Sequence, residues 1–124
     1  MSTNGTNRPT KLHISTQAVT RLLKERDYYH KEVEGERATV ARQRAALQEK
    51  ISSGVTPDEN EEYLIDQRER AIKETEAVLG PLRGKIEKAT SALEDALSTA
   101  DGATPEELEK AKKAIEDAKA ALSA

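Results

Sequence analysis

The sequence contains no cysteine, tryptophan or phenylalanine, and its three tyrosines are its only aromatic residues. Without cysteine, the chain can form neither a disulfide bond nor a thiolate metal site. A small chain with so few aromatic residues has little material for a deep ligand pocket, so we expect functional surfaces. No apolar run reaches the roughly 18 residues of a membrane span, and the first residues, MSTNGTNRPT, lack the apolar core of a signal peptide. We therefore expect the protein in the cytoplasm.

Helix-forming residues dominate what remains. Ala, Glu, Lys, Leu and Arg make up 66 of the 124 residues, whereas Leu, Ile and Val together contribute 22. The charges nearly balance, with 20 Lys and Arg against 23 Asp and Glu. This composition is typical of long helices that bury a narrow apolar stripe.

The first helix is predicted to follow a polar segment. Residues 1–13 are rich in Asn, Thr, Ser, Gly and Pro, which predicts a flexible arm. Beyond it, apolar residues recur at steps of three and four, or multiples of these, and predict a helix over residues 15–52. The residues of this stripe are Val19, Leu22, Tyr29, Val33, Val40, Leu47 and Ile51. Arg26, Glu36 and Gln43 interrupt it, which weakens the interior but helps to fix the pairing register.

Two Thr-Pro sequences mark the starts of two further helices. Residues 56–59 and 104–107 each read as a capping box with proline at the first helical position, so we expect helices over residues 57–100 and 105–123. The predicted stripe of the second helix is Leu64, Arg68, Ala71, Thr75, Val78, Leu82, Ile86, Ala89, Leu93, Ala96 and Ala100. Pro81 lies inside this helix and predicts a kink.

Short connections between these helices require antiparallel neighbours. We therefore predict an all-α fold, an elongated antiparallel three-helix bundle over residues 14–124, with its second helix kinked at Pro81. Because the third helix is short, the end of the bundle around residues 52–56 should be only a two-helix hairpin.

The sequence offers no catalytic or metal-binding motif. His13 and His30 are too far apart for a helical metal pair, and no base, nucleophile and orienting group are brought together by spacing. We expect no enzymatic activity, no cofactor and no metal.

Charge is divided unevenly along the chain. Residues 1–54 carry a net charge of +4 and residues 55–124 a net charge of −7. One explanation is complementarity between neighbouring helices. The other is that outward-facing Arg37, Arg42 and Arg44 attract an acidic protein partner. Nucleic acid is a poorer candidate because the net charge is negative and no stacking aromatics accompany the basic residues, and membrane binding is disfavoured because no strongly apolar outer face is present.

The first predicted helix carries a recognisable run. Residues 19–32, VTRLLKERDYYHKE, resemble the V-x-R-L-x-K-E-x-x-x-Y-x-x-E signature of tubulin-binding cofactor A. The preceding KLHI at residues 11–14, Tyr63 in the second helix and Pro81 in its middle agree with that family, and the similarity covers roughly residues 11–98. The polar residues before Lys11 and Gly80 before the proline depart from it, and the third helix matches by pattern only.

The resemblance implies a tubulin-folding cochaperone that binds β-tubulin after its release from the cytosolic chaperonin and stores it before αβ-heterodimer assembly. It implies a cytoplasmic, cytoskeleton-associated protein that contacts other tubulin-folding cofactors only indirectly, as a monomer or alternatively a homodimer. The competing hypothesis is a generic coiled-coil adaptor or oligomerisation module. The candidate partner-binding residues are Arg21, Lys24, Glu25, Tyr28, Glu32, Arg37, Arg42 and Arg44. Tyr28 is included because adjacent helical positions face different sides, so that Tyr29 lies on the buried stripe and Tyr28 outside it.

Overall fold

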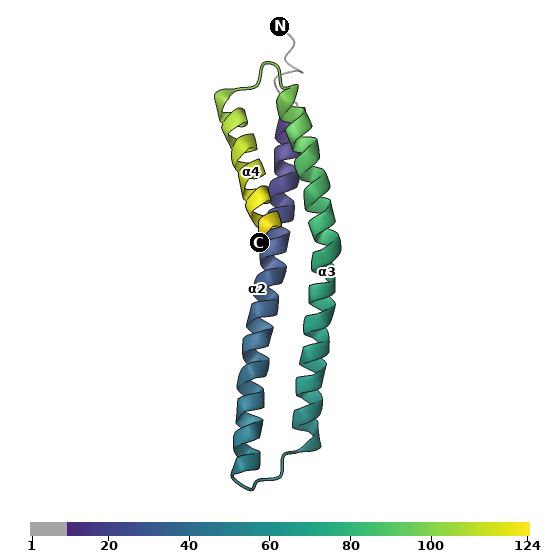
Figure 1. Ribbon diagram of the computed structural model, residues 1–124, viewed down its shortest axis with the longest axis vertical. Coiled ribbons are helices and arrows are strands. Elements are labelled where there is room, and N and C mark those ends of the chain that lie inside the picture. Colours follow the sequence, from purple (N-terminus) through teal and green to yellow (C-terminus); the bar gives the residue numbers. More distant parts are fainter. Residues whose placement is uncertain (1–9) are drawn as a thin grey trace. The chain divides into compact units, whose positions relative to one another are not determined.

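The computed structural model describes residues 10–124, and all regular structure in that range is α-helical (Figure 1). Helix α2 spans Lys11–Ser52, α3 spans Glu59–Ser98 and α4 spans Pro105–Ser123. The prediction of an all-α chain with three helices is confirmed. The predicted arm falls mainly on residues 1–9, which lie outside the described residues, while its positions 11–13 belong to α2.

The helix starts show which capping predictions were correct. At α4 the capping box is present, because the Thr104 hydroxyl accepts a hydrogen bond from the Glu107 amide and the Glu107 carboxylate accepts one from the Thr104 amide. At α3 the predicted box at Thr56 is wrong. The helix begins at Glu59, and Asp58 caps it by accepting a hydrogen bond from the Asn60 amide over 3.1 Å.

Helix α2 begins before its predicted start at Ser15. Thr10 caps it, since the Thr10 hydroxyl accepts a hydrogen bond from the His13 amide over 3.0 Å. Leu12, in the first turn, is buried and ties this turn to the core. Because the composition around these residues is polar, the sequence did not reveal the cap at Thr10 or the core residue Leu12 that follows it.

The chain divides into two compact units. One, here called the three-helix unit, combines the residues up to Arg26 with Pro81–Ala124, and the other, the hairpin unit, is Asp27–Gly80. The hairpin unit contains only parts of α2 and α3, in agreement with the expectation of a two-helix hairpin around residues 52–56.

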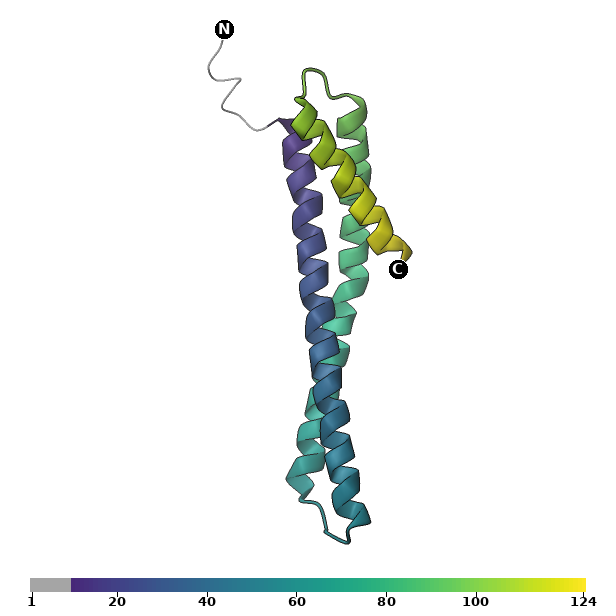
Figure 2. The same cartoon turned by 90° about the vertical axis from the view of Figure 1, so that its left-hand side faces the viewer.

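In the three-helix unit, the first part of α2, the last part of α3 and all of α4 lie side by side (Figures 1 and 2). The Thr10 hydroxyl donates a hydrogen bond to Glu107 over 2.7 Å, and Lys119 pairs with Glu94 over 3.5 Å. These contacts place α4 parallel to α2 and antiparallel to α3. The core side chains are Leu12, Val19, Leu82, Ile86, Leu93, Ala96, Ala111, Ala114 and Ala118.

The buried residues of α4 are all alanines, which lets its backbone approach the other two helices closely. Thr16 and Thr90 are buried beside them, and their hydroxyls donate hydrogen bonds to the carbonyls of Leu12 and Ile86 over 2.8 and 2.6 Å. The core therefore accepts these polar groups without leaving a donor unpaired.

The hairpin unit has a smaller core of five aliphatic residues, Val33, Val40, Leu47, Ile65 and Ile72. Gly54, with φ of 82°, supplies the left-handed conformation that the turn after α2 requires. Charged pairs flank the core, because α2 contributes mostly bases and α3 mostly carboxylates. The pairs between the two helices are Arg37 with Glu76, Arg44 with Asp66 and Glu69, Lys50 with Glu61, and Arg68 with Glu36.

The buried stripe in the first half of α3 lies one residue later than predicted. The predicted positions Leu64, Ala71 and Val78 are exposed, whereas Ile65 and Ile72 are buried. Steps of seven or fourteen residues connect four buried aliphatic positions of this helix, namely Ile65, Ile72, Ile86 and Leu93, and buried Leu82 lies four residues before Ile86. The seven-residue repeat of Ile86 and Leu93 in the second half of the helix therefore continues unshifted into the first half, where Ile65 and Ile72 occupy the same heptad position.

Helix α3 continues through Pro81. Proline has no amide hydrogen, so the carbonyl of Ala77 loses its helical hydrogen bond at this point. The kink at Pro81 stays a prediction.

Candidate functional site

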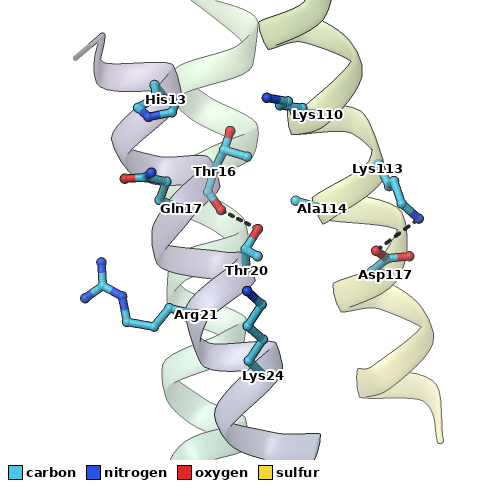
Figure 3. Close-up of a pocket in the computed structure, with 10 residues that line it drawn as sticks. All are labelled: His13, Thr16, Gln17, Thr20, Arg21, Lys24, Lys110, Lys113, Ala114 and Asp117. Carbon is cyan, nitrogen blue, oxygen red and sulfur yellow. Dashed lines mark hydrogen bonds and ion pairs between the residues drawn. The ribbon is translucent and has the colours of Figure 1, made fainter. Parts of the chain in front are cut away.

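A groove with a volume of about 630 Å³ lies between α2 and α4 in the three-helix unit (Figure 3). The α2 side is formed by residues 13–24, which include the start of the recognisable run, and the α4 side by its middle turns. The lining residues are His13, Thr16, Gln17, Thr20, Arg21, Lys24, Lys110, Lys113, Ala114 and Asp117. Two of the candidate partner-binding residues, Arg21 and Lys24, are therefore brought together with lysines of α4.

The charges around this groove are mostly positive. Lys113 pairs with Asp117 over 3.5 Å, and Lys110 with Glu106 over 3.2 Å, both along α4 itself. In the part of the chain that the structure describes, no ion pair engages Arg21 or Lys24, and both are exposed. The α2 rim thus presents two cations that form no ion pair with a described residue.

The floor of the groove is made of small side chains. Thr16 and Ala114 are buried, and the Thr20 hydroxyl donates a hydrogen bond to the Thr16 carbonyl over 3.0 Å (Figure 3). Because the threonine hydroxyls already donate to backbone carbonyls, the floor presents mainly methyl groups. A bound group therefore does not need to supply a hydrogen-bond acceptor there.

Tyr28 and Tyr29 lie next to each other at the start of the hairpin unit. Tyr28 is 59% exposed, whereas Tyr29 is partly buried. Their rings meet edge to face, with centroids 5.5 Å apart and an interplanar angle of 72°. The Tyr28 hydroxyl donates a hydrogen bond to Glu32 over 3.3 Å, and the negative charge of Glu32 raises the pKa of Tyr28. Tyr28 therefore faces outward as predicted, with its hydroxyl oriented by Glu32.

The remaining candidate residues fall into two groups. Glu25 and Arg42 are exposed on α2, and Arg42 donates a hydrogen bond to the Thr39 hydroxyl over 3.2 Å. Arg37 and Arg44 instead contact carboxylates of α3 within the hairpin unit. For these two arginines the structure supports complementarity between helices, although both side chains remain about half exposed.

Sequence reasoning missed Lys110 and Lys113, because the alanine-rich third helix had no motif to point to them. Their spacing of three residues places both on one side of α4, and only the parallel packing of α4 against α2 brings them to the groove. Apolar side chains near the turn of the hairpin unit were also missed, namely Ile51, Val55, Tyr63 and Leu64, all at least half exposed. Ile51 had been predicted as part of the buried stripe.

Two kinds of site find no support in residues 10–124. No group of three or more His, Cys, Asp or Glu side chains in that range could hold a metal ion. Within the same residues, none of the helices combines the length and the apolar character that a membrane span needs.

A family model described as tubulin binding cofactor A matches residues 7–115. The chain belongs to the tubulin binding cofactor A family. This is a family of chaperone cofactors, and the run at residues 19–32 that suggested it lies inside the match. Within the run, Val19 is buried while Arg21, Lys24, Glu25 and Glu32 are exposed, so it combines core positions with a polar surface.

Two solved structures resemble this tubulin binding cofactor A chain. RBL2P, a β-tubulin binding post-chaperonin cofactor, is 31% identical, with a TM-score of 0.74 over 93% of this chain and 100% of its own. Tubulin folding cofactor A from Arabidopsis thaliana is 28% identical, with a TM-score of 0.65 over 88% of this chain and 92% of its own. No curated protein sequence matches the chain.

Proposed function

We propose that this chain captures β-tubulin released from the cytosolic chaperonin and holds it until later cofactors join it to α-tubulin. The observation that carries the proposal is the likeness to RBL2P, a β-tubulin binding post-chaperonin cofactor, over 93% of this chain. The family match over residues 7–115 supports it independently. On this proposal the protein acts by binding alone, without catalysis, in the cytoplasm and in association with the cytoskeleton.

The helices suit the capture of a folded or nearly folded subunit. Helix starts capped by Thr10, Asp58 and Thr104 are ordered before binding, so little conformational entropy is lost when a partner docks. Exposed polar faces keep the free protein soluble and leave charged groups available for recognition. We propose a monomer as the free state, because the core side chains of each unit are buried by other helices of the same chain.

We place the contact surface on α2. It comprises Arg21, Lys24 and Glu25 in the three-helix unit, followed by Tyr28, Glu32 and Arg42 in the hairpin unit. Arg37 and Arg44 contribute through the half of each side chain that α3 leaves exposed. The mixture of cations, one carboxylate-bound tyrosine and acidic residues favours a polar partner surface over an apolar one.

Incubation of the purified chain with separated tubulin subunits tests the proposal. Selective retention of β-tubulin over α-tubulin, at one subunit per chain, is expected. Equal retention of both subunits, or self-association without retention of either, would instead support a generic adaptor. Sedimentation of the free chain over a range of concentrations, without tubulin, tests its monomeric state.

A further inference from the structure

We infer that the groove between α2 and α4 is a docking site for an acidic segment of the captured protein. The inference rests on the proposed function and names the chemistry of one contact. It is carried by the arrangement at the groove, where Lys24 of α2 and Lys110 of α4 point into the space above a floor of small side chains, with Arg21 and Lys113 at the edges of the lining (Figure 3).

Charge decides the class of occupant. The lining contributes four fixed cations, Arg21, Lys24, Lys110 and Lys113, and one fixed anion, Asp117. Asp117 is already paired with Lys113, so it does not cancel the cations on the opposite wall. In Figure 3, Lys110 points toward α2 and Lys24 lies on the α4 side of α2, whereas the Arg21 guanidinium points away from α4. A basic groove on a chain whose net charge is −3 attracts carboxylates locally while the rest of the molecule repels them.

The floor decides the size of the occupant. Thr16, Thr20 and Ala114 leave room because none of them extends far from its helix, and the threonine hydroxyl hydrogens are bonded to backbone carbonyls. From His13 to Lys24 the α2 wall is about 17 Å long at the helical rise per residue. About five residues of extended chain cover that distance. Small apolar side chains on one side of such a segment suit the floor, and carboxylates beside them reach the flexible cations of the rim.

A protein segment fits the groove better than a nucleic acid. The groove contains no aromatic side chain on which a base could stack. Arg21 can hold a carboxylate through two parallel hydrogen bonds, which adds geometric selectivity to charge. Of the four lining cations, Lys113 pairs with Asp117 and Lys110 pairs with Glu106 outside the groove, so the two without an ion pair to a described residue are Arg21 and Lys24 of α2.

Binding of a labelled peptide of about eight alternating Glu and Ala residues tests the inference, with the corresponding Gln-Ala peptide as the neutral probe. The expected result is binding of the Glu-Ala peptide that weakens as salt is raised, without binding of the Gln-Ala peptide. Absence of Glu-Ala binding to the wild-type chain would overturn the inference. A preference for single-stranded oligonucleotide over the Glu-Ala peptide would overturn the assignment to a protein segment.

Two variants with different physical effects localise the contact. Arg21→Glu/Lys24→Glu reverses the free charges and should weaken Glu-Ala binding about tenfold, the effect of about 1.4 kcal/mol. Thr20→Trp keeps the charge but fills the floor, and should weaken binding as well. The matched control is Lys85→Glu/Lys88→Glu, which makes the same charge change at exposed positions of α3 outside the groove. Equal weakening by the control would show that net charge alone is responsible and would overturn the inference.

β-Tubulin capture by the same variants separates this inference from the proposed function. Loss of capture in both groove variants, with the α3 control unaffected, supports the two together. If wild type and groove variants retain β-tubulin equally, the groove assignment is overturned and the proposed function stands. If wild type retains no β-tubulin but binds the Glu-Ala peptide at the groove, the proposed function is overturned while the groove remains an acidic-peptide site. Concentration-dependent dimerisation that Arg21→Glu/Lys24→Glu abolishes would identify a second copy as the occupant and overturn the client assignment.

Discussion

The Thr10 hydroxyl donates a hydrogen bond to the Glu107 carboxylate over 2.7 Å, joining the cap of α2 to the first turn of α4. The same carboxylate accepts the hydrogen bond of the Thr104 amide over 3.3 Å. One glutamate therefore serves both the capping box of its own helix and the contact between two parallel helices. This link lies at the end of the three-helix unit where both α2 and α4 begin.

The link predicts a pH dependence. The hydrogen bond from the Thr10 hydroxyl, and to a smaller extent the one from the Thr104 amide, lowers the pKa of Glu107 below its ordinary value of 4.5. A group whose pKa is lowered by folding stabilises the folded state above that ordinary value, and the contribution is lost as pH falls through the lowered pKa. Glu107→Gln should therefore reduce the melting temperature at pH 7, and the difference from wild type should shrink steadily below pH 4.5. Melting curves over a pH series check this, and a difference that is independent of pH would show that Glu107 acts without its charge.

Gln43 predicts a stabilising substitution in the hairpin unit. Its Oε1 atom is buried and accepts no hydrogen bond from the residues that the structure describes. Burying an unpaired acceptor costs about 1–3 kcal/mol, and an apolar side chain of similar size removes that cost. Gln43→Leu should thus raise the free energy of unfolding by about 1 kcal/mol or more. Denaturant unfolding measures it, with Gln48→Leu, an exposed position on the same helix, as the control that should change little.

The glycines inside the helices predict unequal responses to alanine. A Cβ atom added at Gly35 meets open space, so Gly35→Ala should stabilise the chain by about 0.8–1 kcal/mol through helix propensity alone. Gly80 differs because Pro81 follows it, and the proline ring disfavours helical backbone in a preceding residue that has a Cβ atom. Gly80→Ala should gain clearly less than Gly35→Ala. If chemical denaturation showed equal gains in the free energy of unfolding, the backbone at Gly80 would already have a conformation that a residue with a Cβ atom can adopt before Pro81.

The register of α3 predicts which apolar residues support the fold. Ile72 is buried and Val78 is 40% exposed, although periodicity had predicted the reverse assignment for this part of the helix. Ile72→Ala should cost about 2–5 kcal/mol, as truncations of buried aliphatic residues do. Val78→Ala, at an exposed site, should change stability by no more than about 0.5 kcal/mol. If both variants lost similar free energies of unfolding in urea, the register predicted from the sequence would be supported instead.

These cases show how far the sequence determines the fold. Helix number, the cap at Thr104 and the buried stripe at Val33, Val40 and Leu47 followed from composition and spacing, because each depends on local chemistry and one helical period. The register of α3 was missed because both Leu64 and Ile65 are apolar. Which of two adjacent apolar residues faces inward depends on the partner helix, and that information is not local.

The candidate site was predictable to a similar extent. The run at residues 19–32 identified exposed Arg21, Lys24 and Tyr28 on α2, because outward positions of an amphipathic helix follow from its period. The lysines of α4 were not predicted, since their place in the groove depends on how two helices far apart in sequence pack together. For the same reason, complementarity between neighbouring helices, of which the Arg37–Glu76 pair is an example, could be stated only as one of two alternatives.

The last prediction separates the adjacent tyrosines. Tyr29 is partly buried, so Tyr29→Ala should cost about 2 kcal/mol, less than the 3–5 kcal/mol typical of fully buried aromatic residues. Tyr28 is exposed, and its truncation should cost under about 0.5 kcal/mol. Thermal or denaturant unfolding of the two variants provides the comparison.

Binding should show the opposite order. An exposed tyrosine whose hydroxyl is held by Glu32 and whose ring rests against Tyr29 is preorganised for contact, and tyrosine is enriched among residues that dominate interface energies. Tyr28→Ala should therefore weaken β-tubulin capture while the helices stay folded. Tyr28→Phe, which keeps the ring but loses the hydrogen bond to Glu32, should retain most of the affinity if the ring is the anchor. Retention of β-tubulin by Tyr28→Ala at the wild-type level would remove Tyr28 from the contact surface, whereas equal weakening by both variants would assign the contact to the hydroxyl.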